Sequence, residues 1–158
     1  MELILASGSP RRKELLALVT PEFSVATSDV DESAISAPTP VLLVQKLAHA
    51  KCHAVAVQHP SACVLGCDTV VDVDGEVLGK PHDAADARRM MRLLSGRTHR
   101  VHTGVCLAVP GRPDDVFACT SSVRFAALSE EEIEAYIATP EPYDLSLIHI
   151  SEPTRRRG

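Results

Sequence analysis

Aromatic side chains are scarce in this sequence, which has no tryptophan, two tyrosines and three phenylalanines among its 158 residues. The scarcity argues against a stacking platform for nucleic-acid bases and against an aromatic sugar-binding cleft. A formal net charge of -5 at pH 7 also disfavours a general nucleic-acid binder. No apolar run approaches the ~18 residues that a membrane span requires. We therefore expect no nucleic acid and no membrane as partner, although a local basic site can still bind a small anion.

The cysteines give no sign of a disulfide framework. There are five of them, an odd number, and no two have the Cys-x-x-Cys spacing. Reduced thiols in a cytoplasmic compartment fit this pattern better. The first six residues also lack the basic region of a signal peptide. We expect a cytoplasmic protein.

Helical and strand-like segments alternate along the chain. Leu3 to Ala6 is a short apolar run typical of a buried strand. Ser9 is a suitable N-cap and Pro10 suits a first helical position, which predicts a helix from about Arg11 to Leu18. The same criteria predict helices at residues 41–57, 84–94 and 130–137, and strands at residues 23–28, 64–73, 77–78, 98–109 and 116–125.

Two turns predict hairpins within this alternation. Asp74-Gly75 is a strong hairpin signal, and residues 110–115 separate two β-prone runs. Hairpins are antiparallel, whereas strand–helix–strand units are parallel. The sequence thus predicts an α/β fold whose mixed, twisted sheet is flanked by helices.

The first candidate site is Ser7-Gly8-Ser9-Pro10-Arg11-Arg12. A Gly/Ser turn before a helix leaves backbone N–H groups free at the positive end of the helix dipole. Two hydroxyls and two guanidiniums in the same segment add donors suited to phosphate oxygens. The alternative is an ordinary capped helix with solvated arginines.

Carboxylates and lysines supply the other candidates. Asp68 lies inside an apolar strand, where a buried charge needs an ionic partner, a metal or a functional reason. The alternative is an Asp at a strand edge that hydrogen-bonds to the backbone. The acidic run at 29–32 is either a solvated loop or a set of oxygen ligands for Mg²⁺ or Mn²⁺. Lys51 and Lys80 are either solvated or phosphate-binding. Cations for a polyphosphate and carboxylates for a metal and a water together suit hydrolysis of a phosphoanhydride.

These segments resemble the Maf family of nucleoside triphosphate pyrophosphatases over about residues 1–144. The opening Leu5-Ala6-Ser7-Gly8-Ser9-Pro10-Arg11-Arg12 is similar to the family's first motif. Further matches follow in the family's order: Asp31-Glu32-Ser33, Leu47-Ala48-x-x-Lys51, Gly66-x-Asp68-Thr69-Val70-Val71, Gly79-Lys80-Pro81, Leu94-Ser95-Gly96-Arg97-x-His99-x-Val101-x-Thr103-Gly104-Val105, Tyr136-Ile137 and Glu141-Pro142-x-Asp144. The resemblance implies the fold shared by Maf and inosine-triphosphatase-like proteins.

The resemblance also implies an activity and its residues. The family hydrolyses a nucleoside triphosphate to the monophosphate and pyrophosphate with a divalent metal, Mg²⁺ or Mn²⁺. Asp68 matches the proton acceptor that directs water at the α-phosphorus, and Glu32 with Asp68 matches the metal environment. A water held between the metal and Asp68 reconciles these two roles. The positions that match triphosphate contacts are Ser7, Ser9, Arg11, Arg12, Lys51 and Lys80.

Substrate choice is implied in the same way. Arg11 in Ser-Pro-Arg-Arg and Thr69 directly after Asp68 resemble the branch that hydrolyses dTTP and UTP. By analogy, modified pyrimidine nucleotides are expected substrates too. The alternatives are a 7-methyl-GTP pyrophosphatase and a non-catalytic, nucleotide-binding regulator of septum formation or division.

The C-terminal segment departs from the family pattern. The family's Lys-Ala-Gly-x-Tyr-x-Ile-Gln-like segment after Glu-Pro-x-Asp is absent, and with it the last strand and helix. We interpret residues 1–144 as an incomplete Maf-like domain and residues 145–158 as an artefactual or disordered tail. The homodimer that the resemblance implies for full-length relatives, the solubility and the activity are expected to suffer from the truncation.

Overall fold

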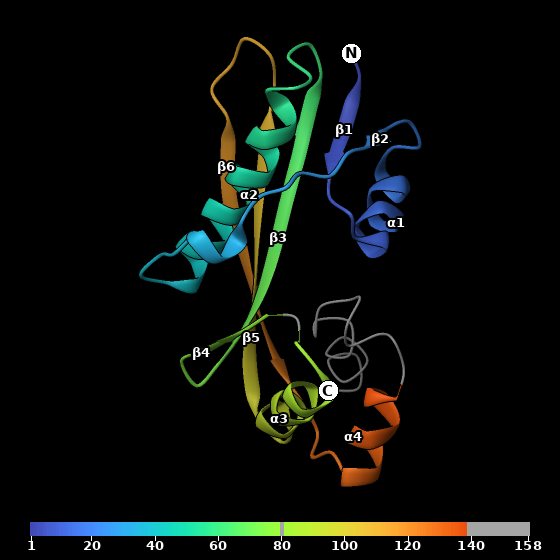
Figure 1. Cartoon of the computed structure of the whole chain (residues 1–158), viewed down its shortest axis with the longest axis vertical. Coiled ribbons are helices and arrows are strands. Elements are labelled where there is room, and N and C mark those ends of the chain that lie inside the picture. Colours follow the sequence, from blue (N-terminus) through green and yellow to red (C-terminus); the bar gives the residue numbers. More distant parts are fainter. Residues whose placement is uncertain (80, 139–158) are drawn as a thin grey trace. The chain divides into compact units, whose positions relative to one another are not determined.

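The computed structural model describes residues 1–79 and 81–138 (Figure 1). The strands are β1 Leu3–Ala6, β2 Ser24–Val25, β3 Cys63–Val73, β4 Glu76–Leu78, β5 Thr98–Ala108 and β6 Asp115–Arg124. The helices are α1 Pro10–Val19, α2 Pro40–Ala56, α3 Ala84–Leu94 and α4 Glu130–Ile137, with a short 3₁₀ helix η1 at Glu32–Ala34. The predicted alternation of helices and strands is confirmed, with bounds within a residue or two for most elements.

Side-chain caps determine where the helices begin. The Ser9 hydroxyl accepts the Arg12 N–H and Pro10 occupies the first turn of α1, as the sequence predicts. Thr39 and Asp83 cap α2 and α3 in the same way. Ser129 and Glu132 form the capping box of α4, each accepting the other's backbone N–H. These local hydrogen bonds explain why the first residues of the helices can be predicted from the sequence.

The sheet is mixed, which confirms the predicted fold class. Its strand order is β2-β1-β3-β5-β6, and β4 pairs with β3 off this path. β1 is parallel to both β2 and β3, whereas β4 is antiparallel to β3. Asp74 and Gly75 both take positive φ, 49° and 85°, in the β3–β4 turn. That conformation suits an Asp-Gly hairpin whose twist matches that of its strands.

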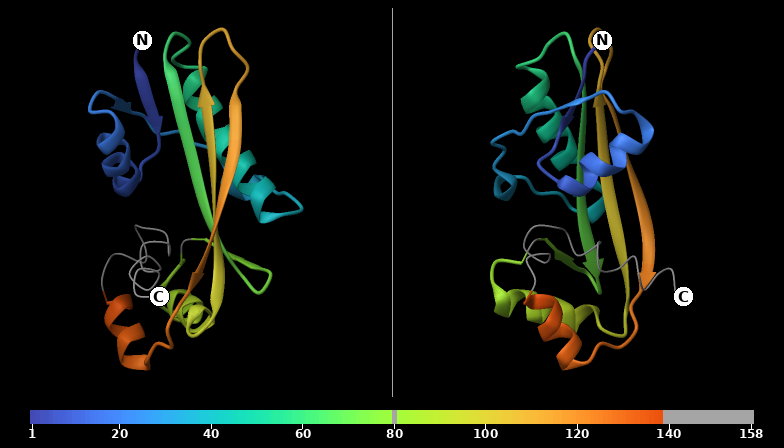
Figure 2. Two further views of the ribbon diagram at one scale, coloured as in Figure 1. Left: turned by 180° about the vertical axis from the view of Figure 1, so that it is seen from behind. Right: turned by 90° about the vertical axis from the view of Figure 1, so that its right-hand side faces the viewer.

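The described residues form two compact units. The first contains Met1–Thr69 and Thr103–Cys119. In it α2 lies along β3 and β5 (Figure 2). Its core is formed by apolar side chains of these three elements, of β1 and of the residue before β3; they are Ile4, Ala6, Ala48, Cys52, Val55, Ala62, Val64, Cys106 and Ala108.

Two glycines let α2 approach the sheet closely. A Cβ at Gly66 would lie 2.7 Å from the Ala48 carbonyl oxygen, and one at Gly104 would lie 2.1 Å from the Val44 carbonyl oxygen. Both distances are far below ordinary van der Waals contact. The glycines therefore fix the height of α2 above β3 and β5, and with it the position of every side chain on the inner face of α2.

The second unit comprises the described residues of 70–102 and 120–138. In this unit α3 and α4 pack on the second halves of β3 and β6 and the first half of β5. The shared core is formed by Val71, Val73, Leu78, Ala87, Met90, Met91, Leu94, Val101, Val123, Phe125, Ile133 and Ile137. His99 is also buried there, and its ring meets Phe125 edge-on with centroids 5.3 Å apart.

One strand is shorter than the sequence predicts. The strand expected at residues 23–28 covers only Ser24–Val25, which pair with Ile4 and Leu5 of β1. Among the described residues, no helix combines the length and the apolar character needed to cross a membrane. Lys80 and residues 139–158, including the interpreted tail, lie outside the described part of the chain.

Candidate functional site

The candidate residues gather where β1 ends. β1 pairs with β3 from Leu3↔Cys63 to Ala6↔Gly66, and the chain then leaves the sheet through Ser7 towards α1. β3 continues, so Asp68 and Thr69 lie beyond the carboxyl end of β1. Ligands of open α/β sheets bind at such strand ends. The topology therefore brings the Ser7–Arg12 segment beside β3, the strand that carries Asp68.

Both serines of the turn hold its shape. The Ser7 hydroxyl accepts the Ser9 N–H at 3.1 Å, and the Ser9 hydroxyl accepts the Arg12 N–H at 3.3 Å. Each hydroxyl keeps its own proton for a further acceptor. Ser7 is buried, whereas Ser9, Arg11 and Arg12 are partly exposed. The turn is thus preorganised, with hydroxyl protons and the helix N-terminus still able to meet an anion.

Arg12 connects this turn to β3. Its Nη2 donates to the Thr69 hydroxyl at 3.0 Å. The Thr69 hydroxyl lies 3.3 Å from that of Thr103 on β5. Guanidinium, Thr69 and Thr103 thus form a hydrogen-bonded chain from α1 across two strands. A guanidinium has five N–H donors, so most of those of Arg12 stay available to other acceptors.

Asp68 lies on the opposite side of β3, since adjacent strand residues point to opposite faces. Its side chain is 12% exposed, and its Oδ1 accepts from the Lys51 ammonium at 2.8 Å. The same ammonium contacts Glu32 Oε1 at 2.6 Å. Glu32 is carried by η1, whose N-cap Asp31 accepts the Ser33 N–H. Lys51 therefore brings two carboxylates, one buried and one exposed, to a single point.

The charges of this cluster fix the state of Lys51. Burial by itself would lower the pKa of Lys51, but the charges and hydrogen bonds of Asp68 and Glu32 outweigh it, and the pKa is raised. Lys51 is accordingly a cation throughout the neutral range. Cys67 next to Asp68 is different, because burial raises the pKa of its thiol and keeps it protonated. The reactive candidate on this strand is therefore the carboxylate.

The donor set suits a divalent cation that also binds phosphate. No group of three or more His, Cys, Asp or Glu side chains within the described residues could hold a metal ion. Asp68 and Glu32 offer two convergent carboxylates. Mg²⁺ commonly uses one or two carboxylates and completes its shell with water and substrate phosphates. The residues present fit such an ion and do not fit an all-protein cage.

Most predicted site residues fall in the first unit. Ser7, Ser9, Arg11 and Arg12 lie at the start of α1, and Lys51, Asp68 and Glu32 form the ionic cluster. Lys51, predicted to contact phosphate, lies between two carboxylates in this structure. Thr69 contacts Arg12, and Lys80 is outside the described residues.

One residue was missed. Thr103 belongs to a quoted motif, but nothing in the sequence indicated that its hydroxyl meets that of Thr69.

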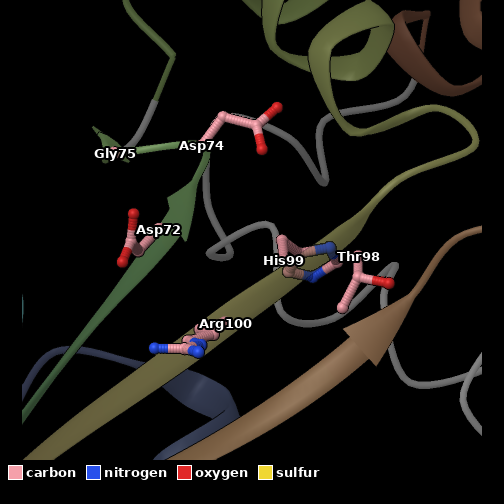
Figure 3. A pocket seen from close by; sticks show the side chains of 6 residues that line it. All are labelled: Asp72, Asp74, Gly75, Thr98, His99 and Arg100. Carbon is pink, nitrogen blue, oxygen red and sulfur yellow. The ribbon is translucent and has the colours of Figure 1, made fainter.

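A depression elsewhere contains none of these residues. It lies in the second unit, has a volume of about 320 Å³, and is lined by Asp72, Asp74, Gly75, Thr98, His99 and Arg100 (Figure 3). Arg97 pairs with Asp74 at its edge, at 2.7 Å. The predicted chemistry thus has no counterpart in this depression.

Comparison with known proteins tests the resemblance directly. A model of the Maf-like protein family matches residues 2–146. The chain belongs to the Maf-like family. A relative named dTTP/UTP pyrophosphatase from Symbiobacterium thermophilum is 54% identical over 143 residues, which cover 90% of this chain and 73% of the relative. Another of the same name, from Bacillus cytotoxicus, is 49% identical, with 90% and 74% covered. The predicted family is confirmed.

Solved structures support the fold. The Ham1 protein of Staphylococcus aureus matches with a TM-score of 0.58 at 17% identity, covering 99% of this chain and 93% of that one. A nucleoside-triphosphatase / dITP/XTP pyrophosphatase from Mycobacterium abscessus matches with a TM-score of 0.51 at 20% identity, covering 78% and 74%. The predicted likeness of the Maf-like fold to inosine-triphosphatase-like proteins is thereby confirmed.

Proposed function

We propose that this Maf-like chain hydrolyses nucleoside triphosphates, dTTP and UTP foremost and modified pyrimidine nucleotides with them, to the monophosphate and pyrophosphate. The relatives' names supply the substrate class. The observation that carries the proposal is the junction on β3, where Asp68 is held by Lys51 and the adjacent Thr69 is held by Arg12. The two side chains point to opposite faces of β3, so the triphosphate is proposed to pass the edge of β3 beyond the end of β1, where both groups can reach it.

The turn and α1 bind the triphosphate. Ser7 and Ser9 donate their hydroxyl protons, the α1 N-terminus contributes its dipole, and Arg11 and Arg12 neutralise the negative charge of the bound triphosphate. Lys80 is proposed as a further cation at the same ligand. Ser7 is buried and both serines are hydrogen-bonded into the turn, so the donors stay in place before and after substrate arrives.

Asp68 acts on the water. Its carboxylate accepts a proton from a water whose oxygen attacks the α-phosphorus. The bond from the α-phosphorus to the bridging oxygen breaks, and its electron pair leaves with pyrophosphate. Lys51 holds the Asp68 carboxylate in one orientation through the 2.8 Å contact between its ammonium and Asp68 Oδ1. The two carboxylates, Asp68 and Glu32, are proposed to hold Mg²⁺ or Mn²⁺, which when bound neutralises phosphate charge and lowers the pKa of water.

Isotope labelling tests this reaction. Hydrolysis of UTP or dTTP in ¹⁸O-water should place one ¹⁸O in the monophosphate and none in pyrophosphate. Label in pyrophosphate would move the attack to the β-phosphorus, and release of inorganic phosphate alone would contradict the proposed reaction.

A substrate panel distinguishes a dTTP/UTP pyrophosphatase from a 7-methyl-GTP pyrophosphatase. UTP and dTTP should be hydrolysed with a higher kcat/KM than 7-methyl-GTP. The reverse order would assign the chain to the alternative substrate, and binding without turnover of any triphosphate would favour the regulatory alternative.

A further inference from the structure

Thr103 has no assigned role, yet its side chain contacts Thr69, the residue that binds Arg12. Its hydroxyl lies 3.3 Å from that of Thr69, which in turn accepts the Arg12 guanidinium at 3.0 Å. The three side chains come from β5, β3 and α1. They are separated by 57 residues between Arg12 and Thr69 and by 34 between Thr69 and Thr103.

The backbone under Thr103 is held firmly. The next residue, Gly104, presses directly on α2, with space for no side chain between it and the Val44 backbone. Thr103 points to the other face of the sheet, where Thr69 lies. Threonine is β-branched and has restricted χ1 freedom, so a fixed backbone also fixes its hydroxyl. Thr103 is therefore the end of the hydrogen-bonded chain whose backbone is fixed by packing, and Arg12 is the opposite end.

The Thr69 hydroxyl has two hydrogen-bond partners, Arg12 and Thr103. The Thr69 oxygen always accepts from Arg12, because a guanidinium cannot accept. Whichever threonine donates in the second bond, Thr103 gives the Thr69 hydroxyl a second fixed partner and limits its rotation. A fixed Thr69 oxygen holds one N–H group of the Arg12 guanidinium, and the remaining N–H groups can then donate to the ligand.

We propose that Thr103 is a positioning residue that acts through Thr69 to orient Arg12 towards the triphosphate. This inference rests on the proposed function, since Arg12 is the group placed on the phosphates there. Thr103 does not touch the reacting atoms. Loss of the Thr103 hydroxyl should weaken substrate binding more than it slows the chemical step, because Asp68 and Lys51 lie on the opposite side of β3.

The test compares Thr103→Val with Thr103→Ser for UTP hydrolysis. Thr103→Val should raise KM about three- to tenfold, the range that loss of one neutral hydrogen bond corresponds to, with a smaller change in kcat. Thr103→Ser keeps the hydroxyl and should restore KM to within about twofold of the unaltered chain. Thr98→Val makes the same change at the exposed first residue of β5 and should leave both constants unchanged.

A double-mutant cycle excludes a merely structural effect. In a Thr69→Val background, Thr103→Val should add nothing further, because the residue through which it acts is gone. An undiminished effect of Thr103→Val in that background, or an unchanged KM in Thr103→Val alone, would overturn the inference. If the unaltered chain releases no pyrophosphate from UTP, the proposed function fails. The unaltered chain, Thr69→Val, Thr103→Val and the double variant are then compared by calorimetry with inorganic pyrophosphate. Thr103→Val should bind pyrophosphate about three- to tenfold more weakly than the unaltered chain, and the double variant no more weakly than Thr69→Val.

Discussion

Replacing Gly104 with alanine should push α2 away from the sheet. The added Cβ would lie 2.1 Å from the Val44 carbonyl oxygen, 2.4 Å from the Val44 carbonyl carbon and 2.9 Å from the Gln45 nitrogen. All three are backbone atoms of a helix, so no side chain can rotate out of the way. Relief to ordinary contact requires α2 and β5 to separate by more than about 1 Å.

The cost follows from this geometry. Overpacking a core costs about 1–3 kcal/mol, and a backbone obstacle belongs at the upper end of that range. Alanine restricts the unfolded chain more than glycine, which returns roughly 0.4–1 kcal/mol. The free energy of unfolding should therefore fall by about 2 kcal/mol, which lowers the urea midpoint by about 1 M for an m-value near 2 kcal/mol/M.

Urea titration followed by circular dichroism measures this shift. Gly79→Ala is the matched control, since no described residue other than its chain neighbours lies within 4 Å of a Cβ there. It should change the free energy of unfolding by less than about 0.5 kcal/mol. Because α2 carries Lys51, Gly104→Ala should also slow UTP hydrolysis under conditions where the variant is folded. An unchanged urea midpoint for Gly104→Ala would refute the described packing of α2 on β5.

Three further outcomes test other parts of the account. Lys51→Met leaves Asp68 without its cation and should lower the free energy of unfolding by about 1–2 kcal/mol, with pyrophosphate release reduced at least about tenfold; equal stability and activity would contradict the ionic cluster. Burial lowers the pKa of His99 from its ordinary 6.5, so the folded chain binds fewer protons than the unfolded chain just below that pH, and stability should fall as the pH drops. Urea midpoints at about pH 7.5 and 5.5 should differ less in His99→Phe than in the unaltered chain, whereas the exposed-residue variant His53→Gln should keep the full difference. EDTA should abolish UTP hydrolysis and excess Mg²⁺ or Mn²⁺ should restore it; full activity in EDTA would remove the metal from the proposal.

Local features of the fold could be predicted from the sequence because their causes are local. The Ser9 cap, the Asp74-Gly75 turn and the Ser129 capping box act within a few residues, and all appear in the structure as predicted. The strand at 23–28 was overestimated for a non-local reason. Its extent depends on how much of it pairs with β1, and Ser24 and Val25 are the two residues that do so.

The contacts inside the site required the tertiary structure. Lys51 was predicted to contact phosphate, but the sequence could not show that the helix register places it on Asp68 and Glu32. Thr103 lies 34 residues from Thr69, and only the pairing of β3 with β5 brings their hydroxyls together. Motif order supplied the candidate residues, whereas their partners are set by strand order and by the glycines beneath α2.

Asp68→Asn tests the central claim most directly, because it removes the proposed base while keeping the size and shape of the side chain. Asp72→Asn is the control, since Asp72 lies four residues further along β3, outside the ionic cluster. Pyrophosphate release from UTP should fall at least about 100-fold in Asp68→Asn, with UTP affinity within about threefold of the unaltered chain. Asp72→Asn should keep its rate. Release by Asp68→Asn at a rate close to that of the unaltered chain would show that another group activates the water.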